Sequence, residues 1–211
     1  MTDLSDINTY INQLYEQETR LTKEKFTHTT QLENYSPVVD DDVARYLKLL
    51  IRMTKPGKIL EIGTCIGYST TSMAQVVKEY GGRITTIEYD DKIAKQAALN
   101  FDYAGVSEVI ELKIGDAMEI LPSLNDKEFD FIFLDVDKRL YPVLFKDCLR
   151  MLKSGGLLVA EDTLFPVLEL DAKWHDLIEP IKQFNQQVIH CPELESTLLP
   201  IGDGVIVARK A

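Results

Sequence analysis

From residue 55 to the C-terminus, short apolar runs alternate with longer stretches of helical periodicity, and this alternation constrains the fold more than any other feature. Strands are expected at 58–62, 83–88, 109–114, 129–135 and 157–162. Helices are expected between and after them, at about 67–79, 91–103, 117–124, 141–152 and 173–189. Strands joined by helices of this length form βαβ units, which give a parallel sheet with helices on both faces.

The C-terminal pattern differs, because the apolar runs 195–201 and 204–210 are separated only by Gly202 and Asp203. A polar connection this short favours an antiparallel hairpin. We therefore predict a Rossmann-like α/β sheet of seven strands that is mostly parallel and ends in an antiparallel hairpin.

Residues 1–53 are predicted to form a helical cover over an α/β core of residues 55–211, within a single domain 1–211. Apolar residues recur at helical spacing over 3–17, and a second helix is expected at about 41–53. The polar stretch between these helices has only scattered apolar anchors, namely Leu21, Phe26 and Leu32. The amphipathic first helix offers an apolar face to a partner, which predicts a homodimer.

Composition narrows the class of protein. The chain has 211 residues, 45% of them hydrophobic and 27% charged, and a net charge of −11, which is globular composition and weighs against binding to a phosphate backbone. Three scattered cysteines without a CxxC pair indicate a reducing compartment. The N-terminus lacks a signal-peptide pattern, and no apolar run reaches the roughly 18 residues of a membrane span. We expect a cytoplasmic protein with no membrane partner.

Ligands of open parallel sheets bind beyond the carboxyl ends of the strands. The first expected strand runs into EIGTCIGYS (61–69), where Gly63 and Gly67 bracket either a plain tight turn or a loop that approaches a ligand. The dinucleotide pattern GxGxxG is absent, which disfavours NAD and FAD. Glu88 ends the second strand, where a carboxylate can accept hydrogen bonds from ribose hydroxyls. A ribose-bearing cofactor without a pyrophosphate fits this pattern best.

Acidic residues also follow the later strands. Asp116 opens a helix, so it is an N-cap, an acceptor for an adenine amine, or both. Two neighbouring strand ends carry the groups FLDVDK, with Asp135, Asp137 and Lys138, and VAEDT, with Glu161, Asp162 and Thr163. Carboxylates from both ends form an oxygen-ligand site for a hard cation such as magnesium, the alternative being helix caps or solvated loop acids.

Taken together, EIGTCIGYS, IEYD, IGDA, FDFIFLDVDK followed by Tyr141-Pro142, GGLLVAEDT and LLPIGDGVIVARK resemble the cation-dependent O-methyltransferases. This family includes catechol and caffeoyl-CoA O-methyltransferases and many bacterial relatives. The resemblance covers roughly residues 36–211. It implies the class I methyltransferase fold, with S-adenosylmethionine (SAM) bound at the ends of the first strands.

The resemblance also implies roles for individual residues. Contacts to SAM are expected from Val38 on the cover, from Glu61, Gly63 and Ser69 on the methionine side, from Glu88 at the ribose, from Asp116 and Ala117 at the adenine, and from Asp135. Asp135 and Asp162 resemble the two metal carboxylates, and Lys138 resembles the residue that helps to deprotonate the acceptor. The third metal ligand of the family is usually an asparagine directly after the second aspartate, where this chain has Thr163.

These features predict a metal-assisted O-methyltransferase that acts on a small catechol-like or phenolic hydroxyl. A tRNA hydroxyuridine methyltransferase, a non-catalytic SAM-binding module and a nicotinamide oxidoreductase are the alternatives. We favour the small aromatic over tRNA because the chain has 34 acidic residues and only 23 basic ones, and several of the acidic residues lie at the expected site. A basic patch on the cover would favour tRNA instead, and its candidates are Arg20, Lys23 and Lys25.

Overall fold

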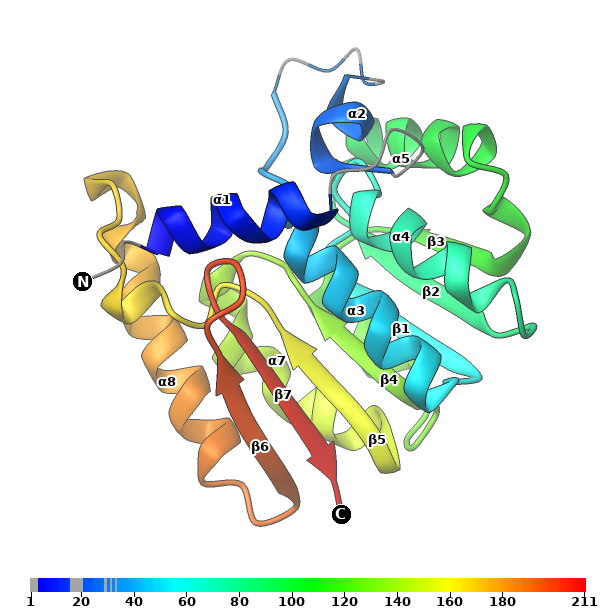
Figure 1. Ribbon diagram of the computed structural model, residues 1–211. Coiled ribbons are helices and arrows are strands. Elements are labelled where there is room, and N and C mark those ends of the chain that lie inside the picture. The colour runs from blue at the N-terminus through cyan, green and yellow to red at the C-terminus, as the bar shows by residue number, and fades with distance from the viewer. Residues whose placement is uncertain (1–3, 16–20, 29, 31, 33) are drawn as a thin grey trace.

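The computed structural model describes residues 4–15, 21–28, 30, 32 and 34–211. In this part of the chain seven strands form one sheet in the order β3-β2-β1-β4-β5-β7-β6 (Figure 1). The strands are β1 (Lys58–Ile62), β2 (Arg83–Glu88), β3 (Ile110–Ile114), β4 (Phe129–Leu134), β5 (Leu152–Ala160), β6 (Leu194–Leu199) and β7 (Val205–Lys210). Strands β1 to β5 pair in parallel, whereas β7 is antiparallel to both β5 and β6. The predicted fold class, including the terminal hairpin, is confirmed.

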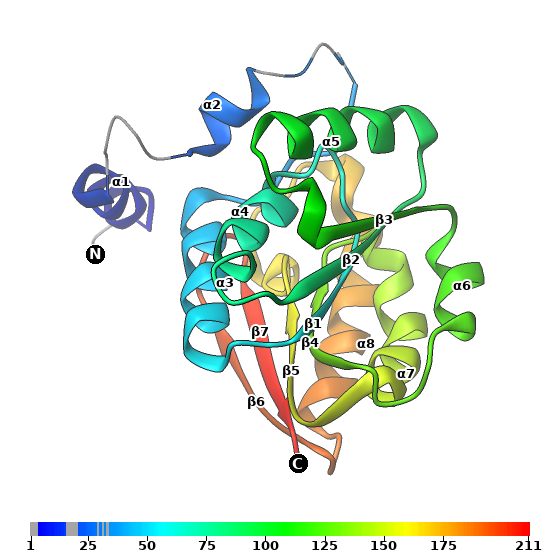
Figure 2. The ribbon, with the colours of Figure 1, turned by 90° about the vertical axis from the view of Figure 1, so that its right-hand side faces the viewer.

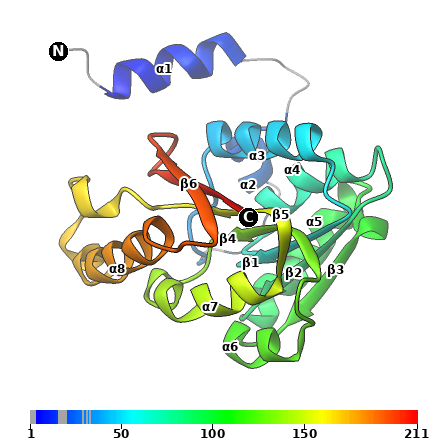
Figure 3. The same cartoon turned by 90° about the horizontal axis from the view of Figure 1, so that it is seen from below.

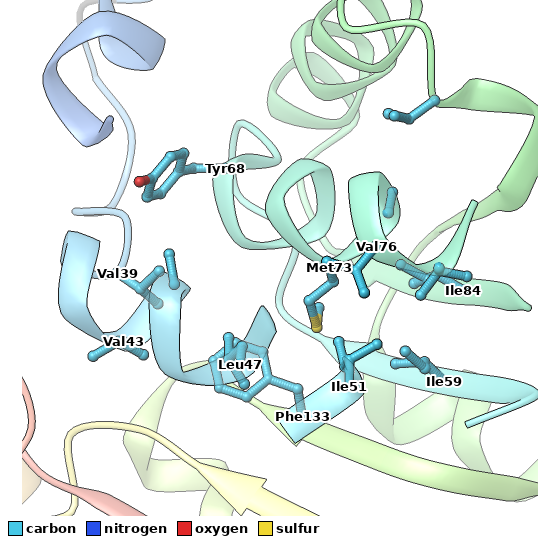
Figure 4. Packing of buried hydrophobic residues seen from close by; sticks show 14 of the residues in the cluster. Val39, Val43, Leu47, Ile51, Ile59, Tyr68, Met73, Val76, Ile84 and Phe133 are labelled. Atoms are coloured by element: carbon cyan, nitrogen blue, oxygen red, sulfur yellow. The ribbon is translucent and has the colours of Figure 1, made fainter. Parts of the chain in front are cut away.

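Helices cover both faces of the sheet (Figure 2). One layer holds α3 (Asp41–Thr54), α4 (Tyr68–Val77) and α5 (Asp91–Tyr103), and the other holds α6 (Ala117–Ile120), α7 (Tyr141–Met151) and α8 (Ile178–Ile189). Successive side chains of β4 enter opposite cores, because strand residues alternate between the faces of a sheet. Phe131 and Phe133 pack in the first core, which Figure 4 shows, while Ile132 and Leu134 pack in the second.

Strand β5 begins at Leu152, five residues before the predicted start at 157. The pairing with β4 jumps from Phe129↔Leu152 to Phe131↔Leu157, so the residues between form a bulge. Gly155 has a φ of +81°, a conformation that favours glycine. The apolar run starts after this bulge, which explains why apolar patterning places the strand too late.

Proline explains where two predicted helices differ from the structure. The stretch predicted as helix 117–124 divides into α6 and a 3₁₀ turn, Leu121–Ser123, that contains Pro122. The stretch predicted as 173–189 begins with a 3₁₀ helix, Ala172–Leu177, and α8 starts only at Ile178. Pro180 lacks an N–H donor and is therefore confined to the first helical turn.

The N-terminal cover contains one helix that the sequence did not predict, α2 (Lys23–Thr27). Thr22 caps it by accepting a hydrogen bond from the backbone N–H of Lys25, and Phe26 is buried with its ring centroid 5.3 Å from that of Tyr68. The predicted anchor Phe26 therefore fixes this short helix to α4.

Helix α1 (Leu4–Tyr15) agrees with the predicted helix 3–17, whose residues 3, 16 and 17 lie outside the described residues. The helix stands apart from the sheet and its layers (Figures 2 and 3). Its last residue, Tyr15, lies under the guanidinium of Arg45 on α3, with the guanidinium carbon 4.6 Å from the ring centroid. Among the described helices, none combines the length and the apolar character that crossing a membrane requires.

Candidate active site

The predicted site residues follow the carboxyl ends of β1 to β5, which are consecutive in the sheet. From β1 the chain proceeds outward to β2 and β3, and it then returns to the other side of β1 to form β4 and β5. The direction of the strand order thus reverses between β1 and β4. Ligands of open α/β sheets bind at such a reversal point, outside the carboxyl ends of the strands.

Two glycines shape the loop that follows β1. Gly63 has a φ of +101°, and a Cβ atom at this position would lie 1.9 Å from the carbonyl oxygen of Asp135. At Gly67, with a φ of +89°, a Cβ atom would lie 2.4 Å from the ring of Phe101. Packing alone therefore requires both glycines, so the tight turn is real whether or not the loop also contacts a ligand.

Glu61 lies beneath this loop and is fully buried. It accepts hydrogen bonds from the hydroxyls of Ser69 at 2.6 Å, Thr86 at 2.7 Å and Thr70. Burial raises the pKa of the Glu61 carboxyl to about 7, although the three hydroxyl donors oppose this rise. Both oxygens are therefore engaged within the protein, and a direct contact of Glu61 with a cofactor stays a prediction.

Glu88 lies at the other side of the same loop. One carboxylate oxygen accepts from the backbone N–H of Cys65 at 2.8 Å and the other from that of Asp90 at 3.0 Å. The thiol of Cys65 donates to the carbonyl of Ser36 at 3.2 Å, which ties the loop to the N-terminal cover. Val38, the predicted contact from the cover, is buried in the adjacent core. Glu88 is half-buried at a strand end, as its predicted role requires.

Asp116 caps α6, accepting from the backbone N–H of Met118 at 2.8 Å, and Ala117 is buried directly behind it. The capping role of Asp116 is thus confirmed, and its contact with adenine stays a prediction. The exposed apolar side chains beside these residues were not predicted from the sequence. Tyr89 follows Glu88 and is 75% exposed, and Met118 is 41% exposed. Large apolar residues next to strand-end carboxylates are the signal that would have identified them.

The ammonium of Lys138 lies between the two predicted metal carboxylates. It is 2.7 Å from Asp135 and 2.8 Å from Asp162, and it donates to the hydroxyl of Tyr141 at 3.2 Å. Burial lowers the pKa of Lys138, but the charges of Asp135, Asp162 and their neighbours outweigh it and raise that pKa well above its ordinary value. The structure therefore brings these three predicted residues together as a charged cluster.

Glu161 joins the same cluster as a third carboxylate. Oxygens of Asp135, Glu161 and Asp162 all lie within 4.8 Å of one another. The reason is strand register: Leu134 pairs with Ala160, so Asp135 and Glu161 are the next residues on the two neighbouring strands. The hydroxyl of Thr163, the predicted third ligand, is buried without a hydrogen-bond partner among the described residues. The sequence pattern predicts Glu161 at this strand end but not among the ligands, because the register of β5 cannot be seen in the sequence.

The cluster carries more negative charge than Lys138 can offset. Burial and the neighbouring carboxylates raise the pKa of Asp135 and raise that of Glu161 well above its ordinary value. Asp203, in the β6–β7 turn, also has a raised pKa because of burial and the charge of Asp162. Oxygen ligands under mutual repulsion suit a hard divalent cation, so the residues present fit a metal ion.

Fold and site together define a class I methyltransferase architecture, and comparison with known proteins identifies the family. The O-methyltransferase family model matches residues 12–211, so the chain belongs to the O-methyltransferase family. The predicted class, a SAM-dependent O-methyltransferase, is thereby confirmed, and a nicotinamide oxidoreductase is no longer a candidate.

Relatives and solved structures agree with this assignment. The chain is 33% identical over 165 residues to catechol O-methyltransferase of Niastella koreensis, covering 76% of this chain and 74% of that protein. It is 32% identical over 181 residues to caffeoyl-CoA O-methyltransferase of Populus kitakamiensis, with 80% and 76% covered. Among solved structures, the Bacillus cereus O-methyltransferase in complex with SAH is 25% identical, with a TM-score of 0.80 and 97% of each chain covered. TomG of Streptomyces achromogenes, in complex with SAM, is 25% identical, with a TM-score of 0.81 and 100% of each chain covered.

The burial of Glu61 predicts a pH-dependent stability. Its folded-state pKa of about 7 lies above the ordinary value of 4.5. As the pH rises from about 4.5 to about 7, Glu61 loses its proton in the unfolded state before it does so in the folded state, and the free energy of unfolding therefore falls. Glu61→Gln removes this ionisation. The variant should therefore gain stability relative to the wild type between about pH 5 and about pH 8, by up to the order of 3 kcal/mol. Urea denaturation across this range measures the difference.

Glu79→Gln is the control for this experiment. Arg52 donates a hydrogen bond to the exposed Glu79 and lowers its pKa. Glu79 is therefore ionised in both the folded and the unfolded state throughout the range, and the difference in stability between Glu79→Gln and the wild type should stay constant. A Glu61→Gln difference that is equally constant would show that Glu61 is not the raised group.

Proposed function

We propose that this O-methyltransferase transfers the methyl group of SAM to a hydroxyl of a small catechol-like or phenolic acceptor, assisted by a divalent cation, with magnesium the best candidate. One observation carries the proposal. Three carboxylates whose oxygens lie within 4.8 Å of one another adjoin the loop after β1, beside the buried amine of Lys138. Oxygen ligands and an amine beside the proposed cofactor site support metal-assisted transfer to a hydroxyl.

For SAM we propose a cleft that follows the ends of β1, β2 and β3. Glu88 binds the ribose hydroxyls with lone pairs that its two backbone donors leave available. Asp116 and Ala117 border the adenine. The exposed ring of Tyr89 and the exposed side chain of Met118 provide apolar surface for it. Gly63 and Ser69 lie on the methionine side. The SAH- and SAM-bound structures of similar chains support SAM as the cofactor.

Replacing Glu88 with alanine should weaken SAM binding at least tenfold. Hydrogen bonds to a charged group contribute about 1.5 to 3 kcal/mol, and about 1.4 kcal/mol corresponds to a factor of ten. Titration calorimetry measures the dissociation constant. Glu111→Ala is the matched control, because Glu111 is an exposed glutamate near the start of β3, whereas Glu88 lies at the end of the neighbouring strand β2. Equal affinity of Glu88→Ala and the control would refute the ribose assignment.

We propose that Asp135, Glu161 and Asp162 hold the cation, with Glu161 in the place that the sequence assigned to Thr163. A bound divalent cation would favour the anionic form of an acceptor hydroxyl, whose pKa is about 10 for a free phenol. If a cation offset the charges of Asp135, Glu161 and Asp162, the burial that lowers the pKa of Lys138 would count for more and would favour its neutral amine. Lys138 can then accept the proton of the acceptor, while the cleft aligns its oxygen with the methyl group for in-line displacement.

The two candidates for the third ligand can be separated by mutation. Because ligand charge sets affinity for hard cations, Glu161→Gln should weaken binding of Mg²⁺ or Mn²⁺ at least about tenfold, whereas Thr163→Val should leave it nearly unchanged. Titration calorimetry of the metal-free protein measures both affinities. The reverse result would return the third place to Thr163. Turnover that resists both a chelator and Asp162→Ala would refute metal assistance altogether.

Electrostatics support a small aromatic acceptor over tRNA. Beyond the three clustered carboxylates, Asp203 adds negative charge to the same end of the sheet. Of the basic residues that would form a patch on the cover, Lys23 is paired with Asp40 at 2.8 Å, and Arg20 lies outside the described residues. A polyanion would approach this surface against repulsion, whereas a catechol needs no phosphate contacts.

A methylation screen tests the acceptor. Purified protein with SAM and Mg²⁺ should methylate a catechol panel at rates well above those on tRNA taken from a strain that lacks this protein. Stoichiometric, salt-sensitive methylation of the tRNA with only trace catechol turnover would favour the tRNA methyltransferase. Absence of turnover on every acceptor, with SAM still bound, would favour the non-catalytic SAM-binding module.

We also propose that the protein forms a homodimer in which a second copy covers α1. Tyr10 and Leu14 on α1 are each 62% exposed, and Figure 3 shows this helix standing away from α3. The outward side of α3 exposes the apolar residues Leu49 and Met53. Two copies can bury the apolar surfaces of α1 and α3 if α1 of each copy packs against the other copy.

A further inference from the structure

The turn that carries Asp162 has an uncommon backbone conformation. Asp162 has a φ of +61°, in the left-handed region, which aspartate tolerates better than most residues with a side chain but still adopts in a minority of cases. Contacts from the surrounding structure select this conformation over the more common ones. The residues that hold this turn therefore decide where the carboxylate of Asp162 lies.

Two elements distant in sequence hold the turn. From the β6–β7 connection, the carbonyl of Gly204 accepts from the backbone N–H of Thr163 at 3.0 Å, and the carbonyl of Asp203 accepts from that of Leu164 at 2.9 Å. From α8, the side-chain amide of Asn185 donates to the carbonyl of Thr163 at 2.8 Å. Asn185 is the one side chain among these contacts, so it can be altered without changing the backbone.

The hydrogen bond to Thr163 fixes the orientation of the Asn185 side chain. Its amide oxygen is buried without a hydrogen-bond partner among the described residues, so the amide nitrogen makes the one polar contact that the structure gives this side chain. On the other side of the turn there is no room to shift, because a Cβ atom on Gly204 would lie 2.5 Å from the backbone nitrogen of Leu164. The turn is thus clamped between the hairpin and Asn185.

We propose that Asn185 is a positioning residue for Asp162: by holding the carbonyl of Thr163, it fixes the left-handed turn that presents the carboxylate to the metal. This inference rests on the proposed metal site. Asn185 acts through the turn and touches neither the metal nor the acceptor. Partners that orient a ligand in this way typically change metal affinity by about 10-fold to 100-fold when they are lost.

The test compares two variants of the same helix. Asn185→Leu removes the donor with little change in volume. Gln187→Leu is the matched control, because the amide oxygen of Gln187 is also buried without a partner in the described part of the chain, where Gln187 makes no hydrogen bond to the turn. Electron paramagnetic resonance of Mn²⁺ added to the full-length protein without SAM measures metal affinity directly. Thermal unfolding of the metal-free variants reports any general loss of stability.

We expect Asn185→Leu to weaken Mn²⁺ binding by about tenfold while the control binds as the wild type does. Asn185→Gln, which keeps the donor, should recover part of the loss. Equal affinities of Asn185→Leu and Gln187→Leu would overturn the role of Asn185 while leaving the metal site intact. A wild-type protein that binds no Mn²⁺ would overturn the metal site, and the positioning role with it.

Discussion

The arrangement of the whole site depends on one close approach, that of the loop after β1 to the end of β4. Gly63 lies against the backbone of Asp135 so closely that a Cβ atom would lie 1.9 Å from its carbonyl oxygen. The backbone N–H of Asp135 in turn donates to the carbonyl of Ile62 at 2.9 Å, which continues the β1–β4 pairing to the carboxyl ends of the two strands. Because these two strand ends touch, the loop after β1 and the carboxylate cluster lie side by side. Any side chain at position 63 would separate them.

Much of the fold was accessible from the sequence because most of its strands are buried on both faces. The predicted strands 58–62 and 83–88 match β1 and β2, and the predicted helix 91–103 matches α5, since their apolar patterns end where the elements end. The errors have local causes that composition does not show. The bulge before Leu157 hides the start of β5, and Pro180 delays the start of α8.

The site was predictable in its strand ends but not in its register. Asp135, Lys138 and Asp162 were expected at neighbouring strand ends, and Lys138 lies within hydrogen-bond distance of both carboxylates. The membership of Glu161 follows from the pairing of Leu134 with Ala160, which no single segment specifies. The same limit applies to the clamp by Asn185, because a helix residue and a strand-end turn meet only once the tertiary fold is formed. Local patterns indicate which residues face an edge, and long-range pairing decides which of them meet.

The pairing of β1 with β4 also has a consequence for how the protein becomes active. These two central strands are separated in sequence by α4, β2, α5, β3 and α6, so their contact closes a long loop, and such contacts form slowly during folding. The groups that follow β1, β4 and β5, together with Asn185 on α8, come from segments spread over most of the chain. A fragment that contains them all must span at least residues 63–185. Until β1 and β4 pair, the groups that follow these two strands have no fixed position relative to one another, so the candidate site depends on closure of the central pair.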